Sequence, residues 1–230
     1  MRFISRFALS VITLSIGLLA QSAQAVSLTA PVSPNPFADT ALGGTTAAAR
    51  PELAGTVLQD VISPFSFSGV SGSVQNRVVR ETGTGTLDFY WKVNVDASTN
   101  GTGVSAFRLA DFGYNNLKDA DFRTDGLGTT GPDTARLFNV ANYPAGDINF
   151  LFNGTGGVAP GSESRFFFLH TTATSYDKIA SYDLLTTGAQ KLSGSFQTFA
   201  PAVPEPSTYA LMGAGMLMMG ALLRGRRRGQ

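Results

Sequence analysis

Short runs of alternating apolar and polar residues, separated by turn residues, occupy most of the chain between residues 53 and 200. The clearest run is TLDFYWKVNVD, at residues 86–96. Its odd-numbered residues are apolar and lie on one face of an extended chain: Leu87, Phe89, Trp91, Val93 and Val95. Its even-numbered residues are mostly polar and lie on the other face: Asp88, Tyr90, Lys92, Asn94 and Asp96. A period of two over this length predicts a half-buried antiparallel strand.

Further strands are expected at residues 56–62, 74–81, 104–112, 135–140, 147–152, 164–172, 178–185 and 192–199. The turn sequence SGVSGS separates the first two, and NGTG at 100–103 predicts a hairpin that pairs 86–96 with 104–112. In SRFFFLHT both faces are apolar, which predicts a central strand covered on both sides. Because the body has no sustained 3.6-residue stripe, we predict an all-β fold, an antiparallel β-sandwich or jelly roll at 53–200.

Two segments of the body lack this alternation. Residues 26–52 are rich in Pro, Ala and Thr, and we expect a flexible lead-in with room for one edge strand. Residues 115–133, NNLKDADFRTDGLGTTGPD, are rich in Asp and Gly and predict a long surface loop.

The composition of the body excludes several classes of protein. It has no cysteine, so disulfides, Cys-ligated metals and a Cys nucleophile are excluded. Six of the 17 basic residues lie at the two ends of the chain, which leaves 11 against 15 acids between Val26 and Val203, a net charge of about −4. Such a body gives no electrostatic reason to expect nucleic acid or anionic lipid as a partner.

The first 25 residues have the form of a secretory signal peptide. MRFISRFALSVITLSIGLLAQSAQA begins with two arginines, continues with an apolar stretch and ends in an A-x-A cleavage signal at Ala23 and Ala25. Cleavage after Ala25 is expected, and the alternative is an uncleaved membrane anchor. Either way the body is exported.

The last segment, residues 201–230, combines prolines, an apolar run and an arginine cluster. Pro201, Pro204 and Pro206 predict an extended linker. The uncharged run that follows predicts a short transmembrane helix at 208–223, and its 15 residues from 209 span about 22 Å, less than the roughly 30 Å of a bilayer core. The arginines that follow predict a stop-transfer cluster inside the cell, with the body outside: Arg224, Arg226, Arg227 and Arg228.

These C-terminal residues resemble the PEP-CTERM sorting domain, a motif also labelled the C-terminal domain of ice-binding proteins. The resemblance covers about the last 28 residues and rests on the arginine cluster, the apolar run and one hexapeptide: Val203, Pro204, Glu205, Pro206, Ser207 and Thr208. It implies a Gram-negative bacterium that makes exopolysaccharide. It also implies recognition of Pro204, Glu205 and Pro206 by a membrane exosortase, which removes or exchanges the tail on the way to the cell surface.

The body offers few residues for chemistry. His170, the one histidine, has no nucleophile motif around it, so we expect a polar residue that closes a strand, with a general base as the alternative. One His and no Cys argue against zinc, and no cofactor is expected. Asp119, Asp121 and Asp125 are a weak calcium candidate, because Arg123 stands where a calcium loop needs an oxygen ligand.

We therefore expect a non-enzymatic protein of the cell surface or extracellular matrix, associated with exopolysaccharide or biofilm and held only transiently in the inner membrane. One alternative is a carbohydrate-binding or adhesive module that uses exposed tyrosines: Tyr90, Tyr114, Tyr143, Tyr176 and Tyr182. Another is a secreted glycoside hydrolase, which needs two carboxylates about 5–10 Å apart in a cleft. Glu52, Glu81 and Glu163 stand in no context that identifies such a pair.

Overall fold

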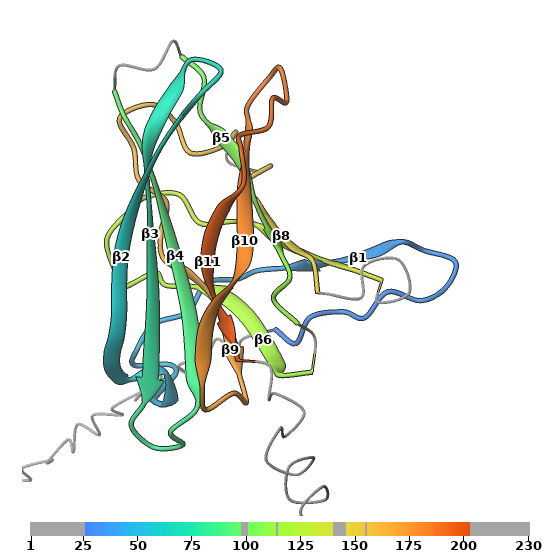
Figure 1. The fold of residues 1–230 in the computed structure, drawn as a ribbon, viewed down its shortest axis with the longest axis vertical. Helices are drawn as coiled ribbons and strands as arrows, with labels where there is room; N and C mark the ends of the chain where they lie inside the picture. Colours follow the sequence, from blue (N-terminus) through green and yellow to red (C-terminus); the bar gives the residue numbers. More distant parts are fainter. Residues whose placement is uncertain (1–25, 98–100, 114, 140–145, 155, 203–230) are drawn as a thin grey trace, which may run out of the picture.

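The computed structural model describes residues 26–97, 101–113, 115–139, 146–154 and 156–202. In this part of the chain, two antiparallel sheets pack face to face (Figure 1). Their strands are β1 (Phe37–Ala41), β2 (Gly55–Phe67), β3 (Val70–Glu81), β4 (Leu87–Val95), β5 (Val104–Ala110), β6 (Leu117–Phe122), β7 (Thr134–Phe138), β8 (Ile148–Leu151), β9 (Phe167–Thr171), β10 (Tyr176–Thr186) and β11 (Phe196–Pro201). A single turn of 3-10 helix, η1 (Pro51–Leu53), precedes β2. The predicted all-β sandwich is confirmed in these residues.

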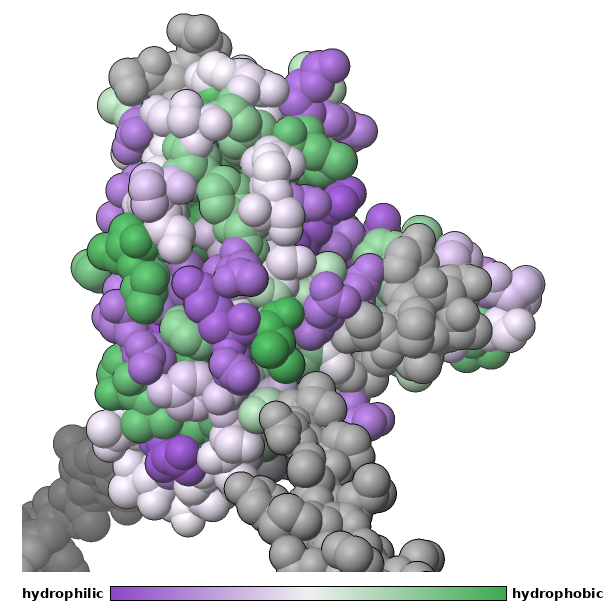
Figure 2. Space-filling model, viewed as in Figure 1, coloured by the Kyte–Doolittle hydropathy of each residue, from purple (hydrophilic) through white to green (hydrophobic). Residues whose placement is uncertain are grey.

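The strand order within each sheet sets which residues become neighbours. The six-stranded sheet has the order β1-β7-β8-β5-β10-β11, and the five-stranded sheet has the order β2-β3-β4-β9-β6. β1 is an edge strand that pairs with β7, within the segment predicted as a lead-in, and Figure 1 shows it extending to one side of the sandwich. On the face in view, apolar residues are scattered among polar ones without one continuous apolar area (Figure 2).

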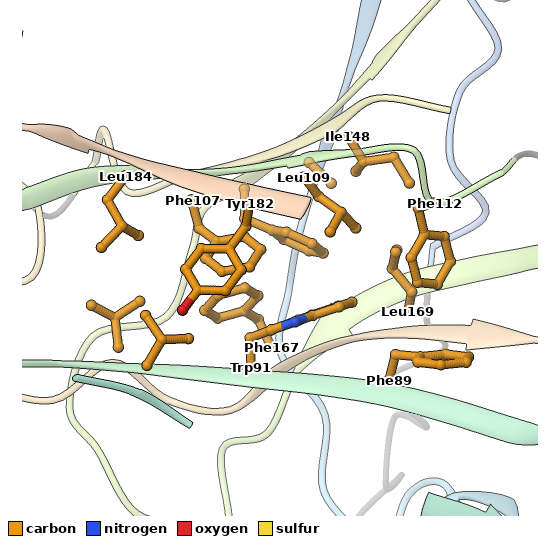
Figure 3. Close-up of a cluster of buried hydrophobic side chains, with 14 of the residues drawn as sticks. Phe89, Trp91, Phe107, Leu109, Phe112, Ile148, Phe167, Leu169, Tyr182 and Leu184 are labelled. Carbon is orange, nitrogen blue, oxygen red and sulfur yellow. The ribbon is translucent and has the colours of Figure 1, made fainter. Parts of the chain in front are cut away.

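The core between the sheets is built from aromatic rings. Trp91 of β4 packs 5.5 Å from Phe107 of β5, and Phe107 stacks 4.8 Å from Tyr182 of β10, measured between ring centroids. Figure 3 shows these side chains, with Phe167, filling the space between the two sheets. The five apolar residues predicted on one face of β4 are all buried here, so that prediction is confirmed.

The other face of β4 is also buried, which corrects the prediction of a half-buried strand. Asp88, Tyr90 and Lys92 are 0%, 5% and 8% exposed. The reason is a second, smaller apolar cluster on the outer face of the five-stranded sheet, formed by Leu53, Val79, Tyr90, Phe166 and Phe168. β9, predicted from SRFFFLHT to be covered on both faces, is buried throughout.

Two predicted connections are wrong. The turn at 100–103 does not form a hairpin, because β4 already pairs with β3 and β9, and β5 therefore joins the opposite sheet. Residues 115–133 are not entirely loop, because Leu117–Phe122 forms β6 at the edge beside β9. Its aspartates could enter a strand because groups elsewhere in the fold bind them, as described below.

The turn between β2 and β3 is tighter than the SGVSGS region suggested. It consists of Ser68 and Gly69, both with positive φ (48° and 80°), as two-residue hairpin turns require. The remaining residues of that stretch belong to β3.

Several predictions fall on residues outside the described part: the signal peptide with Ala23 and Ala25, the sorting hexapeptide at 203–208, the helix at 208–223 and the arginine cluster at 224–228. Within the described residues, no helix has the length and apolar character needed to cross a membrane.

Candidate functional site

Chemically active residues gather on the outer face of the five-stranded sheet. Asp88 of β4 lies opposite His170 of β9, and His170 lies opposite Asp119 of β6. Because side chains alternate along a strand, these three face away from the core, while their neighbours Phe89 and Leu169 face into it. The sheet thus aligns one histidine between two carboxylates.

The β3–β4 hairpin adds a third carboxylate. Glu81 ends β3, and its Oε2 accepts hydrogen bonds from the hydroxyls of Thr84 and Thr86. The His170 Nδ1 lies 2.9 Å from Glu81 Oε1 and 2.9 Å from Asp88 Oδ1. Within the described part of the chain, Glu81, Asp88 and His170 are the one group of three such side chains placed to hold a metal ion, with ligand atoms all within 4.8 Å of one another. We call this group the His170 cluster.

The His170 cluster is closed to solvent and incompletely hydrogen-bonded. Glu81, Asp88 and His170 are 2%, 0% and 4% exposed. The ring nitrogen of His170 is hydrogen-bonded to Asp88 Oδ1, but Glu81 Oε1 and Asp88 Oδ2 have no hydrogen-bond partner. Two buried carboxylate oxygens therefore lack a hydrogen bond, although Glu81 Oε1 lies 2.9 Å from the His170 ring nitrogen.

Burial shifts the protonation of this cluster. It raises the pKa of Asp88 to about 6, against the opposing hydrogen bond and charge of His170. Burial alone would lower the pKa of His170, but the hydrogen bond that its ring N–H donates to Asp88 and the charges of Asp88, Asp119 and Glu81 raise it above its ordinary value.

Arg50 covers the neighbouring carboxylate. Its Nη1 and Nη2 donate to the two oxygens of Asp119 at 3.0 and 3.2 Å, and its Nε donates to Glu52 at 2.8 Å. Arg50 is only 6% exposed, and its guanidinium carbon lies 5.7 Å from the ring centroid of Phe168. The segment predicted as a lead-in therefore seals this face of the sheet.

The aspartates of the calcium hypothesis are each bound by the protein. Asp119 pairs with Arg50, Asp121 accepts from the backbone N–H of Gly44 at 2.8 Å, and Asp125 pairs with Arg123 at 2.8 Å. The structure does not bring them together as a ligand set. Sequence reasoning did not predict that Glu81 and Asp88 would lie beside His170. The signal available was the acid on each side of the turn in ETGTGTLD, because a hairpin at this turn brings the two acids together.

A groove of about 570 Å³ lies on the same outer face. It is lined by η1, β2, β3, β4 and the segment after β6: Leu53, Ala54, Gly55, Val57, Gln75, Arg77, Val79, Tyr90, Arg123, Gly126, Leu127 and Phe166. The Arg77 guanidinium stacks 4.7 Å above the Phe166 ring and also contacts Asp60 at 2.7 Å. None of the lining residues is acidic.

Two polar atoms of this groove are buried without a hydrogen bond, the Tyr90 hydroxyl and Arg77 Nε. Burial raises the pKa of Tyr90, so its phenol is neutral and able to donate. Of the tyrosines considered as an exposed platform, Tyr90 and Tyr182 are buried, and Tyr114 and Tyr143 lie outside the described residues.

Comparison with known proteins identifies the C-terminal segment. Residues 202–228 match the family model of the PEP-CTERM protein-sorting motif. The chain carries a PEP-CTERM protein-sorting motif. This motif supports an exported protein that is targeted to an exosortase, as the resemblance implied. No curated protein and no solved structure matches the chain.

Proposed function

We propose that this PEP-CTERM protein is a non-enzymatic component of the cell surface or extracellular matrix, and that its sandwich body binds exopolysaccharide in the groove beside Tyr90. The observation that carries the proposal is the mixed lining of the groove, in which the Arg77 guanidinium stacks on Phe166 beside apolar side chains. Sugars present apolar faces to apolar side chains and hydroxyls to polar groups. The groove lining contains apolar side chains together with Gln75, Arg77 and Arg123.

Stacking and hydrogen bonds, rather than net charge, drive binding in this proposal. Arg77 and Arg123 are already paired with Asp60 and Asp125, and the body is net acidic. Affinity for the polysaccharide therefore changes little between low and physiological salt, in contrast to binding by free cations.

The test uses the exported protein and polysaccharide from its host, with binding measured by calorimetry. Arg77→Ala and Phe166→Leu are expected to weaken binding at least tenfold. Arg108→Ala, which removes an arginine paired with Asp183 on the opposite sheet, is the matched control and leaves binding unchanged. Equal binding by all variants, or no binding by the parent protein, overturns the proposal.

The sorting route proposed with it places the chain transiently in the inner membrane of a Gram-negative cell, with the body outside and the helix at 208–223 as its anchor. The exosortase then releases the body to the surface. Mass spectrometry of the surface-released protein, from cells with and without the exosortase, is expected to find the tail clipped near Pro206 only when the enzyme is present. A chain intact to Gln230 in both cases contradicts this route.

The hydrolase alternative calls for a pair of carboxylates that a sugar chain can reach. Glu81 and Asp88 are close together, but they are buried and do not line the groove. We therefore favour binding over hydrolysis. The hydrolase alternative predicts that the pure protein releases reducing sugar from the host polysaccharide. It also predicts that Asp88→Asn loses this activity.

A further inference from the structure

The charges of the His170 cluster do not balance. Glu81 and Asp88 are buried, and Arg50, whose charge acts on Asp88, already donates to Asp119 and Glu52. Within the described residues, His170 is the group that forms an ion pair with both carboxylates when its imidazole is protonated. Even a protonated imidazole supplies one charge for two.

The hydrogen bonds do not balance either. One Nδ1 stands within 2.9 Å of two carboxylate oxygens and can present only a single N–H to them. It is hydrogen-bonded to Asp88 Oδ1, so Glu81 Oε1 and Asp88 Oδ2, in side chains that are entirely buried, have no donor. Buried anionic oxygens in this state point to an absent positive partner.

We propose that Glu81, Asp88 and His170 bind a divalent transition cation, Zn²⁺, through the two carboxylates and the imidazole Nδ1. An imidazole nitrogen with carboxylate oxygens suits zinc, whereas calcium takes oxygen ligands alone. Tetrahedral zinc with bonds of about 2.0–2.1 Å holds its ligand atoms about 3.3 Å apart. The 2.9 Å separations of Nδ1 from Glu81 Oε1 and Asp88 Oδ1 need to widen by a few tenths of an ångström. The two carboxylate oxygens, which lie within 4.8 Å of each other, have to come to about this separation when the ion binds.

The surroundings hold the ligands in place. Thr84 and Thr86 donate to the second oxygen of Glu81, which orients the first toward His170. The sequence, with one His and no Cys, argued against zinc. The structure adds two carboxylates from one hairpin to the single histidine, which gives three zinc ligands. The ion joins β3, β4 and β9, and its burial makes it a structural cross-link in an exported chain that has no cysteine for disulfides.

The experiment measures metal content and stability of the exported protein. Because the site is closed, the protein is unfolded in urea with EDTA and refolded with Zn²⁺, Ca²⁺ or no metal, then freed of loose metal by gel filtration. Elemental mass spectrometry is expected to find one Zn²⁺ per chain, with a higher urea midpoint than the metal-free protein. The proposal is overturned if the protein retains Ca²⁺ but not Zn²⁺. It is also overturned if the protein retains less than about a tenth of a zinc ion per chain.

Isosteric variants locate the ion. Glu81→Gln and Asp88→Asn keep the volume of each side chain and are expected to weaken zinc binding at least tenfold. Glu52→Gln removes a carboxylate from Arg50, close to the cluster but outside it, and leaves zinc binding within twofold of the parent. Full zinc occupancy in Glu81→Gln overturns the assignment. If a variant does not refold, X-ray absorption of the zinc-loaded parent protein decides: one imidazole with oxygen ligands supports the site, and ligation without imidazole refutes it.

Discussion

The indole Nε1 of Trp91 on β4 donates a 2.8 Å hydrogen bond to the hydroxyl of Thr198 on β11, which joins the two sheets through the core. Thr198 in turn donates to Asn76 Oδ1 on β3 at 2.9 Å. All three residues are at most 2% exposed. A polar relay therefore crosses an interior that is otherwise built from aromatic rings.

Replacing Thr198 by Val removes both hydrogen bonds and leaves the Trp91 N–H and the Asn76 carbonyl oxygen buried without partners. We expect the free energy of unfolding to fall by about 2–4 kcal/mol, since each orphaned group costs about 1–3 kcal/mol. Thr198→Ser keeps the hydroxyl and is expected to cost about 1 kcal/mol. Urea unfolding followed by the fluorescence of Trp91, the one tryptophan, measures both variants. Equal losses in the two contradict the relay.

Tyr90→Phe is expected to be neutral or to stabilise the protein by up to about 1 kcal/mol. The buried hydroxyl that it deletes faces Arg123 but makes no hydrogen bond of ordinary geometry. The ring keeps its contacts with Phe168 and Phe166, at centroid distances of 5.0 and 6.3 Å. Tyr90→Leu, which loses those ring contacts, serves as the destabilised comparison. Chemical denaturation distinguishes the two, and a loss above about 1 kcal/mol in Tyr90→Phe shows that the hydroxyl has a partner.

Asp125 gives the fold a defined response to acid. Its hydrogen bond with Arg123 holds its pKa at about 2, below the ordinary 3.8, and its carboxylate also accepts from the Ala47 N–H at 2.6 Å. A lowered pKa in the folded state means that this stabilisation is present above about pH 4 and is lost as the pH falls toward 2. Asp125→Asn is therefore expected to cost about 0.5–1 kcal/mol at pH 5 and almost nothing at pH 2. The urea midpoints of the parent protein and Asp125→Asn, measured at pH 5, 3 and 2, test this prediction. A difference between their midpoints that grows as the pH falls contradicts it.

The sorting motif makes a prediction about processing. Glu205→Ala alters the centre of the Pro-Glu-Pro sequence, and we expect the chain to accumulate in the membrane fraction with its tail attached. Intact-mass measurement of membrane and medium fractions follows this. Glu163→Ala removes an acid from the folded body and is expected to be processed as the parent is. Normal release of the Glu205→Ala chain refutes the role given to this residue.

The sequence predicted what depends on local pattern. Alternation placed Leu87 to Val95 on the core face of β4, and the doubly apolar run around Phe168 indicated an interior strand. It could not predict what depends on distant partners. The polar face of β4 is buried because η1 and the residues around it cover the sheet, and β6 tolerates Asp119 because Arg50, 69 residues away, binds it.

The same limit applies to the His170 cluster. The two acids that flank the turn at residues 81–88 are a local signal, but only the register of β4 against β9 brings Asp88 opposite His170. Pairing of strands far apart in the chain is set by the global topology and not by local alternation. The C-terminal motif, in contrast, is contiguous and could be identified from residues 202–228 alone.

The position of β11 has a mechanical consequence. Among the described strands, β11 is an edge strand whose backbone pairs with β10 alone. The Ala202 N–H still donates to the Ser175 carbonyl, and the sorting motif begins at that same residue 202. Tension that reaches the body through the residues after Ala202 is therefore applied first to β11. Under load this strand peels away first, and its departure also breaks the bond from Trp91 to Thr198.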